Sequence, residues 1–114
     1  LTYLSAGHPQ YIRVKKGTDE LLGAKGDVLG AFEKAYFEPV NYKVAPGERI
    51  FLYTDGLIEG FGSNRLHRKE GLDQLCALCA ETTGLKLDEA VTKIMARFHN
   101  EASEDDLLLL GLEV

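Results

Sequence analysis

Hydrophobic residues in the first part of the chain follow the short patterns that are typical of β-strands. Residues 2–5 and Tyr11–Lys15 are rich in Tyr, Ile and Val, and they flank the turn-forming stretch Gly-His-Pro-Gln at 7–10. This arrangement predicts a short hairpin that ends at Gly17. Residues 23–30 contain three glycines and predict a loop.

A second group of strand signals surrounds a reverse turn. Residues 36–44 alternate well enough for a strand, and 45–48 (Ala-Pro-Gly-Glu) place Pro and Gly where a turn needs a fixed φ and a positive φ. The continuous apolar run Ile-Phe-Leu-Tyr at 50–53 predicts a strand that is buried on both faces. We expect it to stop at Thr54-Asp55-Gly56.

Helical spacing follows a polar loop predicted over 60–69. Apolar residues recur at i, i+3, i+4 and i+7 in a first helix that ends at Gly84, and they keep the same period in a second helix. The two stripes are Leu72, Leu75, Cys76 and Cys79, then Leu87, Val91, Ile94, Met95 and Phe98. Residues 107–114 predict a closing strand in which Gly111 marks a bulge or a close approach.

This order of elements predicts an α+β fold in which two helices, placed before the last strand, pack on a mainly antiparallel sheet. The length of 114 residues and 45% hydrophobic content fit one core, and we see no linker that would divide the chain. We therefore expect residues 1–114 to belong to a single domain. The chain begins at Leu1, inside an apolar segment that reads as a strand under way, so we expect a segment upstream.

Charge and hydropathy exclude several classes of function. The formal net charge of −5 argues against a nucleic-acid partner, since phosphate backbones are bound by clustered Lys and Arg. The short basic run over 65–69 is typical of a solvated loop, although it could meet an acidic, phosphorylated protein. The longest apolar stretch, 107–110, is far too short to span a membrane, and 1–9 lack the pattern of a signal peptide. We expect a cytoplasmic protein.

Asp55 and Asp105 are the most informative pair of polar residues. Asp55 follows the predicted buried strand, and Asp105 stands where the final strand begins. If these strands are antiparallel neighbours, the two carboxylates converge. Two carboxylates about 4 Å apart repel by roughly 4 kcal/mol at an effective dielectric near 20, and a hard cation such as Mg²⁺ or Mn²⁺ would offset this. The alternative is a plain turn at 55–56 and a solvated strand start at 105–106.

Four motifs occur in order along the chain and carry a family resemblance. They are Tyr-Leu-Ser-Ala-Gly-His-Pro at 3–9, Leu-Gly at 29–30, Pro-Gly-Glu-Arg-Ile-Phe-Leu-Tyr-Thr-Asp-Gly-Leu-Ile-Glu at 46–59, and Glu-Asp-Asp at 104–106 before apolar residues. Together they resemble the bacterial SpoIIE-type branch of the protein phosphatase 2C superfamily, over essentially the whole chain. The resemblance implies half of a layered α-β-β-α sandwich, namely the C-terminal portion of one phosphatase domain.

The resemblance also implies a two-metal centre that holds Mn²⁺ or Mg²⁺. It assigns Asp55 and Asp105 as metal ligands, and it places Glu59 near a weaker third metal, unless Glu59 is a solvated loop carboxylate. Gly56 belongs to the motif, and Asp106 is expected to support its neighbour. A further metal ligand of the family comes from an N-terminal Asp-Gly motif that this chain lacks, so we expect this chain to be inactive alone.

The remaining candidate residues have simpler interpretations. His8 could act as a general acid, but in a Gly-His-Pro turn a hydrogen-bonded structural role is favoured. Cys76 and Cys79 have the spacing of a redox or zinc pair, yet both fall on the apolar stripe of the first helix, which favours core packing and fits a reducing compartment.

The resemblance implies a hydrolase that acts on phosphoserine or phosphothreonine through a metal-activated water. Its expected substrate is a phosphorylated regulatory protein such as an anti-sigma-factor antagonist, and an upstream sensor or receiver domain would be usual. The alternative is an inactive phosphatase-like scaffold that binds a partner without turnover. Strand edges left open by a missing half would favour a homodimer.

Overall fold

The computed structural model describes residues 2–3, 10–22, 40–59, 68–98 and 108–114. Its centre is a four-stranded antiparallel sheet in the order β3-β2-β5-β6, and a separate two-stranded sheet joins β1 to β4. These strands are β1 (Thr2–Tyr3), β2 (Tyr11–Lys15), β3 (Thr18–Leu22), β4 (Val40–Asn41), β5 (Arg49–Tyr53) and β6 (Leu109–Glu113). The helices are α1 (Asp55–Glu59), α2 (Arg68–Glu81) and α3 (Leu87–Phe98), and a 3₁₀ turn spans Thr82–Gly84.

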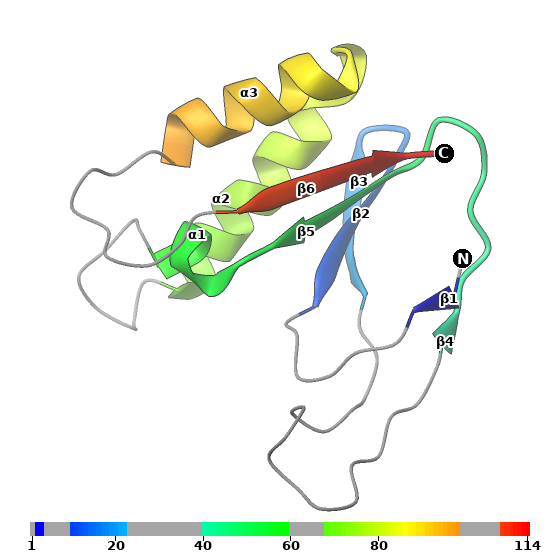
Figure 1. The fold of residues 1–114 in the computed structure, drawn as a ribbon, viewed down its shortest axis with the longest axis horizontal. Coiled ribbons are helices and arrows are strands. Elements are labelled where there is room, and N and C mark those ends of the chain that lie inside the picture. Colours follow the sequence, from blue (N-terminus) through cyan, green and yellow to red (C-terminus); the bar gives the residue numbers. More distant parts are fainter. Residues whose placement is uncertain (1, 4–9, 23–39, 60–67, 99–107) are drawn as a thin grey trace, which may run out of the picture.

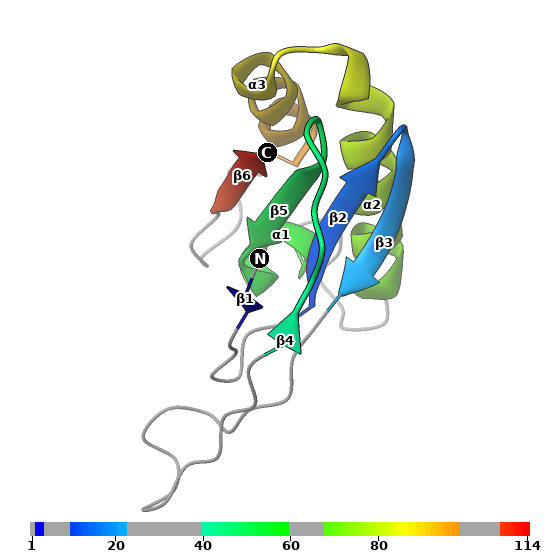
Figure 2. The ribbon, with the colours of Figure 1, turned by 90° about the vertical axis from the view of Figure 1, so that its right-hand side faces the viewer.

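The elements form layers. Helices α2 and α3 cover one face of the four-stranded sheet, and the β1–β4 pair lies on the side of the opposite face (Figure 1, Figure 2). The expected α+β fold, with two long helices before the last strand, is confirmed. No helix among the described residues is long and apolar enough to cross a membrane.

The core lies between the sheet and the two long helices. Phe51, Tyr53 and Ile12 of the sheet meet the predicted apolar stripes of α2 and α3 there. The side chain of Phe98, the last residue of the second stripe, lies outside the described part of the chain. Gly111 allows β6 to lie close to α3, because an added Cβ would lie 3.0 Å from Leu87 Cδ1 and 3.2 Å from both Phe51 Cε1 and Val91 Cγ2. The expected close approach at Gly111 is therefore confirmed.

The predicted N-terminal hairpin is wrong. β1 pairs with β4 through Thr2 and Asn41, whereas β2 pairs with β3 and β5. The true hairpin turns at Lys16 and Gly17, which both have positive φ, 50° and 79°, as a two-residue turn between twisted strands requires. Strand β3 was not predicted, because its first residues, Thr-Asp-Glu, are exposed at the sheet edge and show no apolar alternation.

Other boundaries differ by smaller amounts. The strand expected over 36–44 is seen at Val40–Asn41, since 42–44 leave the ladder and 36–39 lie outside the described residues. The closing strand begins at Leu109, and Arg68 and Lys69 belong to α2 and not to a loop. The turn at 45–48 is confirmed by the hydrogen bond from Glu48 N to Ala45 O (3.1 Å) and by Gly47 at φ 90°.

Two arginines, the buried Arg49 and the partly buried Arg13, connect separate elements of the fold. Arg49 of β5 donates to Glu113 Oε1 (3.0 Å), to Thr82 O (3.0 Å) and to Leu85 O, so it joins β5 and β6 to the corner between α2 and α3. Arg13 of β2 binds the buried Glu48 side chain (Nε to Oε2, 3.0 Å). Burial alone raises the pKa of Glu48, but the hydrogen bond and charge of Arg13 outweigh it, so this pKa lies below its ordinary value.

Candidate metal site at the end of strand β5

Asp55 lies at the surface, two residues after the end of strand β5. Four of its five residues are buried, as expected for a central strand, and the chain emerges after Tyr53. Asp55 is exposed and opens helix α1, whereas the next three residues, Gly56, Leu57 and Ile58, are buried. The predicted place of Asp55 at the end of a buried strand is confirmed.

The antiparallel pairing of β5 with β6 is also confirmed. The ladder ends where Tyr53 pairs with Leu109, and the next residues, Thr54 and Leu108, are still joined by hydrogen bonds. Thr54 N donates to Leu108 O (3.1 Å), and Leu108 N donates to the side-chain Oγ1 of Thr54 (3.0 Å). The end of β5 therefore lies beside the start of β6, as the convergence of Asp55 with Asp105 requires.

Several predicted site residues lie outside the described part of the chain. They are His8, Asp105 and Asp106; for Glu59 only the backbone, the last residue of α1, is described. Their roles, and the distance between the Asp55 and Asp105 carboxylates, stay predictions. Gly56 is buried in α1, directly after Asp55.

Among the described residues, the proposed metal site has one candidate ligand, Asp55. No group of three or more His, Cys, Asp or Glu side chains that could hold a metal occurs among them. The exposed carboxylate of Asp55 offers the hard oxygen that Mg²⁺ and Mn²⁺ prefer. A complete centre therefore needs ligands from residues outside the described ranges.

Helix α1 was missed by sequence reasoning, although it carries Asp55. Five residues are too few to show a helical period. The usable signal was local: Thr54 is of a type preferred before a first helical turn, and Leu57 N does donate to Thr54 O (3.0 Å). Leu57 and Ile58 then anchor the turn in the core, at 0% and 1% exposure.

The two cysteines are core residues, as predicted. Cys76 and Cys79 are both buried free thiols within the hydrophobic cluster. Burial raises the pKa of Cys76 to about 11 and shifts that of Cys79 upward as well. Thiols in this state are poor nucleophiles and metal ligands at neutral pH.

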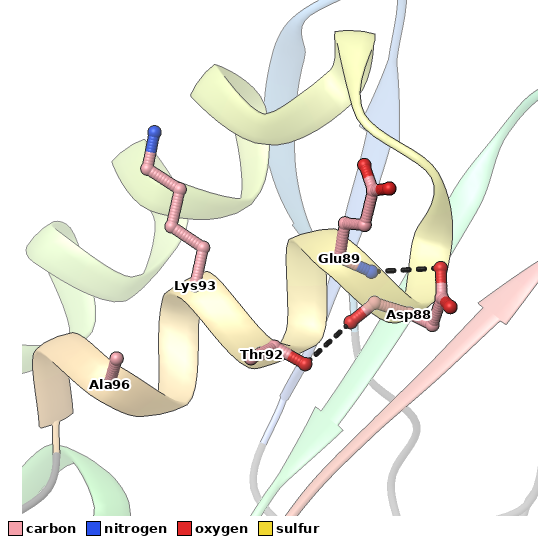
Figure 3. A pocket seen from close by; sticks show the side chains of 5 residues that line it. All are labelled: Asp88, Glu89, Thr92, Lys93 and Ala96. Atoms are coloured by element: carbon pink, nitrogen blue, oxygen red, sulfur yellow. Dashed lines mark hydrogen bonds between the residues drawn. The ribbon is translucent and has the colours of Figure 1, made fainter.

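A shallow depression on the outer face of α3 offers no catalytic alternative. Its lining comes from one helix, and its hydrogen bonds are local, from Glu89 N to Asp88 Oδ1 (2.9 Å) and from Thr92 Oγ1 to Asp88 O (2.9 Å) (Figure 3). Lys93 and Ala96 complete this lining. Such a set is typical of a solvated helix face.

Comparison with known proteins identifies the family. The model of the family described as Stage II sporulation protein E (SpoIIE) matches residues 1–114, so the chain belongs to the SpoIIE family. Protein IcfG from Synechocystis sp. is 26% identical over 120 residues, covering 98% of this chain and 18% of IcfG. Phosphoserine phosphatase RsbP from Bacillus subtilis is 33% identical over 60 residues, covering 52% of this chain and 15% of RsbP.

Solved structures share the fold. The RsbU and RsbW domains of Rv1364c from Mycobacterium tuberculosis superpose with a TM-score of 0.72 at 21% identity, covering 98% of this chain and 31% of that one. The SiaA-PP2C domain of Pseudomonas aeruginosa gives 0.64 at 17% identity, covering 92% and 42%. The Mn-presoaked phosphatase domain of SpoIIE from B. subtilis gives 0.61 at 16% identity, covering 99% and 50%.

These matches define the class as the phosphatase family that contains SpoIIE. The chain spans less than a fifth of the two curated relatives and half of the B. subtilis phosphatase domain.

Proposed function

We propose that this chain contributes to a metal-dependent protein phosphatase that hydrolyses phosphoserine or phosphothreonine on a regulatory protein. Family membership over residues 1–114 supports the reaction class, and one relative is named a phosphoserine phosphatase. The observation that carries the proposal is the exposed carboxylate of Asp55, held at the end of β5 beside the start of β6.

In this proposal Asp55 and Asp105 each contribute a carboxylate ligand to a two-metal centre, with Glu59 near a weaker metal. The bound Mn²⁺ or Mg²⁺ would supply an acidified water and offset the charge on the transferring phosphoryl group. Asp55 would hold its metal at the surface end of the sheet, where a phosphorylated side chain can approach. Asp106 and Gly56 would support this geometry, and His8 is assigned a structural role.

The same proposal makes residues 1–114 the C-terminal portion of a larger phosphatase domain. Strand β6 is at a sheet edge. Four exposed apolar side chains, two in β6 and one directly before and after it, form an apolar stripe: Leu108, Leu110, Leu112 and Val114, exposed by 60%, 48%, 43% and 50%. These residues alternate with Leu109 and Gly111, which face the helices, so the stripe lies on the sheet face away from α2 and α3. We propose that this stripe is covered by another segment of the complete protein. That segment corresponds to the half of the B. subtilis phosphatase domain that this chain does not match.

We further propose that the substrate is a phosphorylated regulatory protein and that an upstream sensor or receiver domain controls the activity in the cytoplasm. The length of the relatives beyond the matched region leaves room for such a domain. Pairing of open strand edges in a homodimer belongs to the same proposal.

The test uses the complete protein that contains this chain and a phosphoserine protein substrate, assayed with and without Mn²⁺. We expect turnover only with the metal, and a loss of at least about 100-fold in Asp55→Asn, because a neutral amide binds a hard cation far more weakly. Asp73→Asn changes another exposed aspartate, on α2, and should stay within about twofold. Full activity of Asp55→Asn would refute the assignment.

A further inference from the structure

Helix α1 is too short to hold its own position. An isolated helix needs roughly 12–15 residues to be even marginally stable, and α1 has five. Its inner residues Leu57 and Ile58 are buried, whereas Asp55 at its first position is exposed. The direction in which Asp55 points therefore depends on what α1 contacts.

Gly71 of α2 packs directly against the backbone of α1. A Cβ added at this position would lie 2.2 Å from the backbone oxygen of Ile58, 3.0 Å from its carbonyl carbon and 3.3 Å from its Cα. The neighbour is backbone, so no side-chain rotation can relieve the overlap. The absence of a side chain at Gly71 is what lets α2 pack directly on the last turn of α1.

Thr54 holds the other end of α1. Its carbonyl accepts the Leu57 N–H of the helix (3.0 Å), and its hydroxyl accepts the Leu108 N–H from the chain entering β6 (3.0 Å). The residue before Asp55 is thus bonded both to α1 and to the neighbouring strand. With Gly71 at one end and Thr54 at the other, α1 is held at both ends.

We propose that Gly71 and Thr54 are positioning residues, which fix helix α1 and thereby hold the Asp55 carboxylate in the orientation that binds a divalent cation. This inference rests on the proposed function of Asp55. Neither residue contacts the metal in this account; each acts through the backbone of α1.

The expected effect follows from the distances. An alanine at 71 requires the Ile58 oxygen to retreat by at least 0.8 Å, from 2.2 to 3.0 Å, which moves α1 relative to α2. A displacement of about 1 Å at a reacting group can lower a rate by about 100-fold. Removing the Thr54 hydroxyl deletes one hydrogen bond and leaves more freedom at the start of α1, so its effect should be smaller.

The experiment measures Mn²⁺ activation of the complete protein with p-nitrophenyl phosphate as the probe substrate. We expect Gly71→Ala to raise the Mn²⁺ concentration for half-maximal activity by at least about tenfold, with activity partly restored at high Mn²⁺. Gly84→Ala is the matched control, since a Cβ there has no neighbour within 4 Å, and it should match the wild type. Thr54→Val should raise the Mn²⁺ concentration for half-maximal activity severalfold. Thr54→Ser keeps the hydroxyl and should have the wild-type Mn²⁺ requirement.

The outcomes separate positioning from mere stability. A purely structural role would lower the melting temperature and leave the Mn²⁺ requirement of the folded protein unchanged. If Gly71→Ala does not fold, the comparison of Thr54→Val with Thr54→Ser decides. Folded Gly71→Ala and Thr54→Val proteins with wild-type Mn²⁺ requirements overturn the inference while leaving Asp55 in place. A wild-type protein that binds no Mn²⁺ by calorimetry overturns both proposals.

Discussion

Replacing Arg49 with methionine should destabilise the domain through the loss of hydrogen bonds at the corner between α2 and α3. The Arg49 side chain is 4% exposed, and its guanidinium donates to two backbone carbonyls, Thr82 O and Leu85 O, as well as to Glu113. Methionine keeps much of the apolar stem and supplies no donor. We therefore expect a loss of hydrogen bonding with little loss of packing.

The loss in the free energy of unfolding depends on the three hydrogen-bond acceptors of Arg49. Hydrogen bonds with a charged donor contribute about 1.5–3 kcal/mol each, but Thr82 O also accepts from Leu85 N (3.0 Å) and so keeps one donor. The larger penalty falls on Leu85 O. Glu113 is 43% exposed and can be hydrated, so its ion pair contributes at most about 1 kcal/mol. Since methionine also avoids the cost of burying a cation, we expect a net loss of about 2–3 kcal/mol.

The assay is equilibrium unfolding of the complete protein in urea, followed by tyrosine fluorescence or circular dichroism. Glu113→Gln is the matched control, because it removes the ion pair and leaves both carbonyl bonds in place; it should cost less than about 1 kcal/mol. If Arg49→Met cost no more than Glu113→Gln, the carbonyl contacts would not be the source of stability, and this account of the corner would be wrong.

Two further changes test other parts of the structure. The pKa of Glu48 is lowered from 4.5 in the folded state. Its carboxylate therefore stabilises the folded protein above pH 4.5, and this stabilisation is lost as the pH falls through the folded-state pKa. The free energy of unfolding measured against pH should show this loss in the wild type and not in Glu48→Gln. Leu112→Asp should lower the stability of the complete domain by about 2–3 kcal/mol if the stripe on β6 is covered there, whereas Ala96→Asp on the exposed face of α3 should cost less than about 1 kcal/mol. Equal, small effects of both substitutions would mean that the stripe stays in water.

The sequence was most informative where burial is periodic. The stripes of α2 and α3, the buried run of β5 and the turn at Gly47 each follow from local chemistry, and all are found. The motif containing Asp55 also predicted its place at a strand end. These features need no knowledge of the rest of the fold, because a single face or a single φ angle determines each.

Features that depend on distant partners could not be predicted in the same way. The pairing of β1 with β4 joins residues almost 40 positions apart, whereas local turn signals favoured a pairing with β2. Helix α1 is stabilised by Leu57 and Ile58 packing in the core and by the close approach of Gly71, and none of these contacts is visible in five residues of sequence. The convergence of Asp55 with Asp105 is supported only through the register of β5 and β6.

The location of bound metal tests the central claim most directly. Crystals of the complete phosphatase domain soaked in Mn²⁺ and measured by anomalous scattering should show a metal within about 2.0–2.6 Å of an Asp55 carboxylate oxygen, and that peak should vanish in Asp55→Asn. A metal bound elsewhere, with the Asp55 carboxylate left in solvent, would contradict the account.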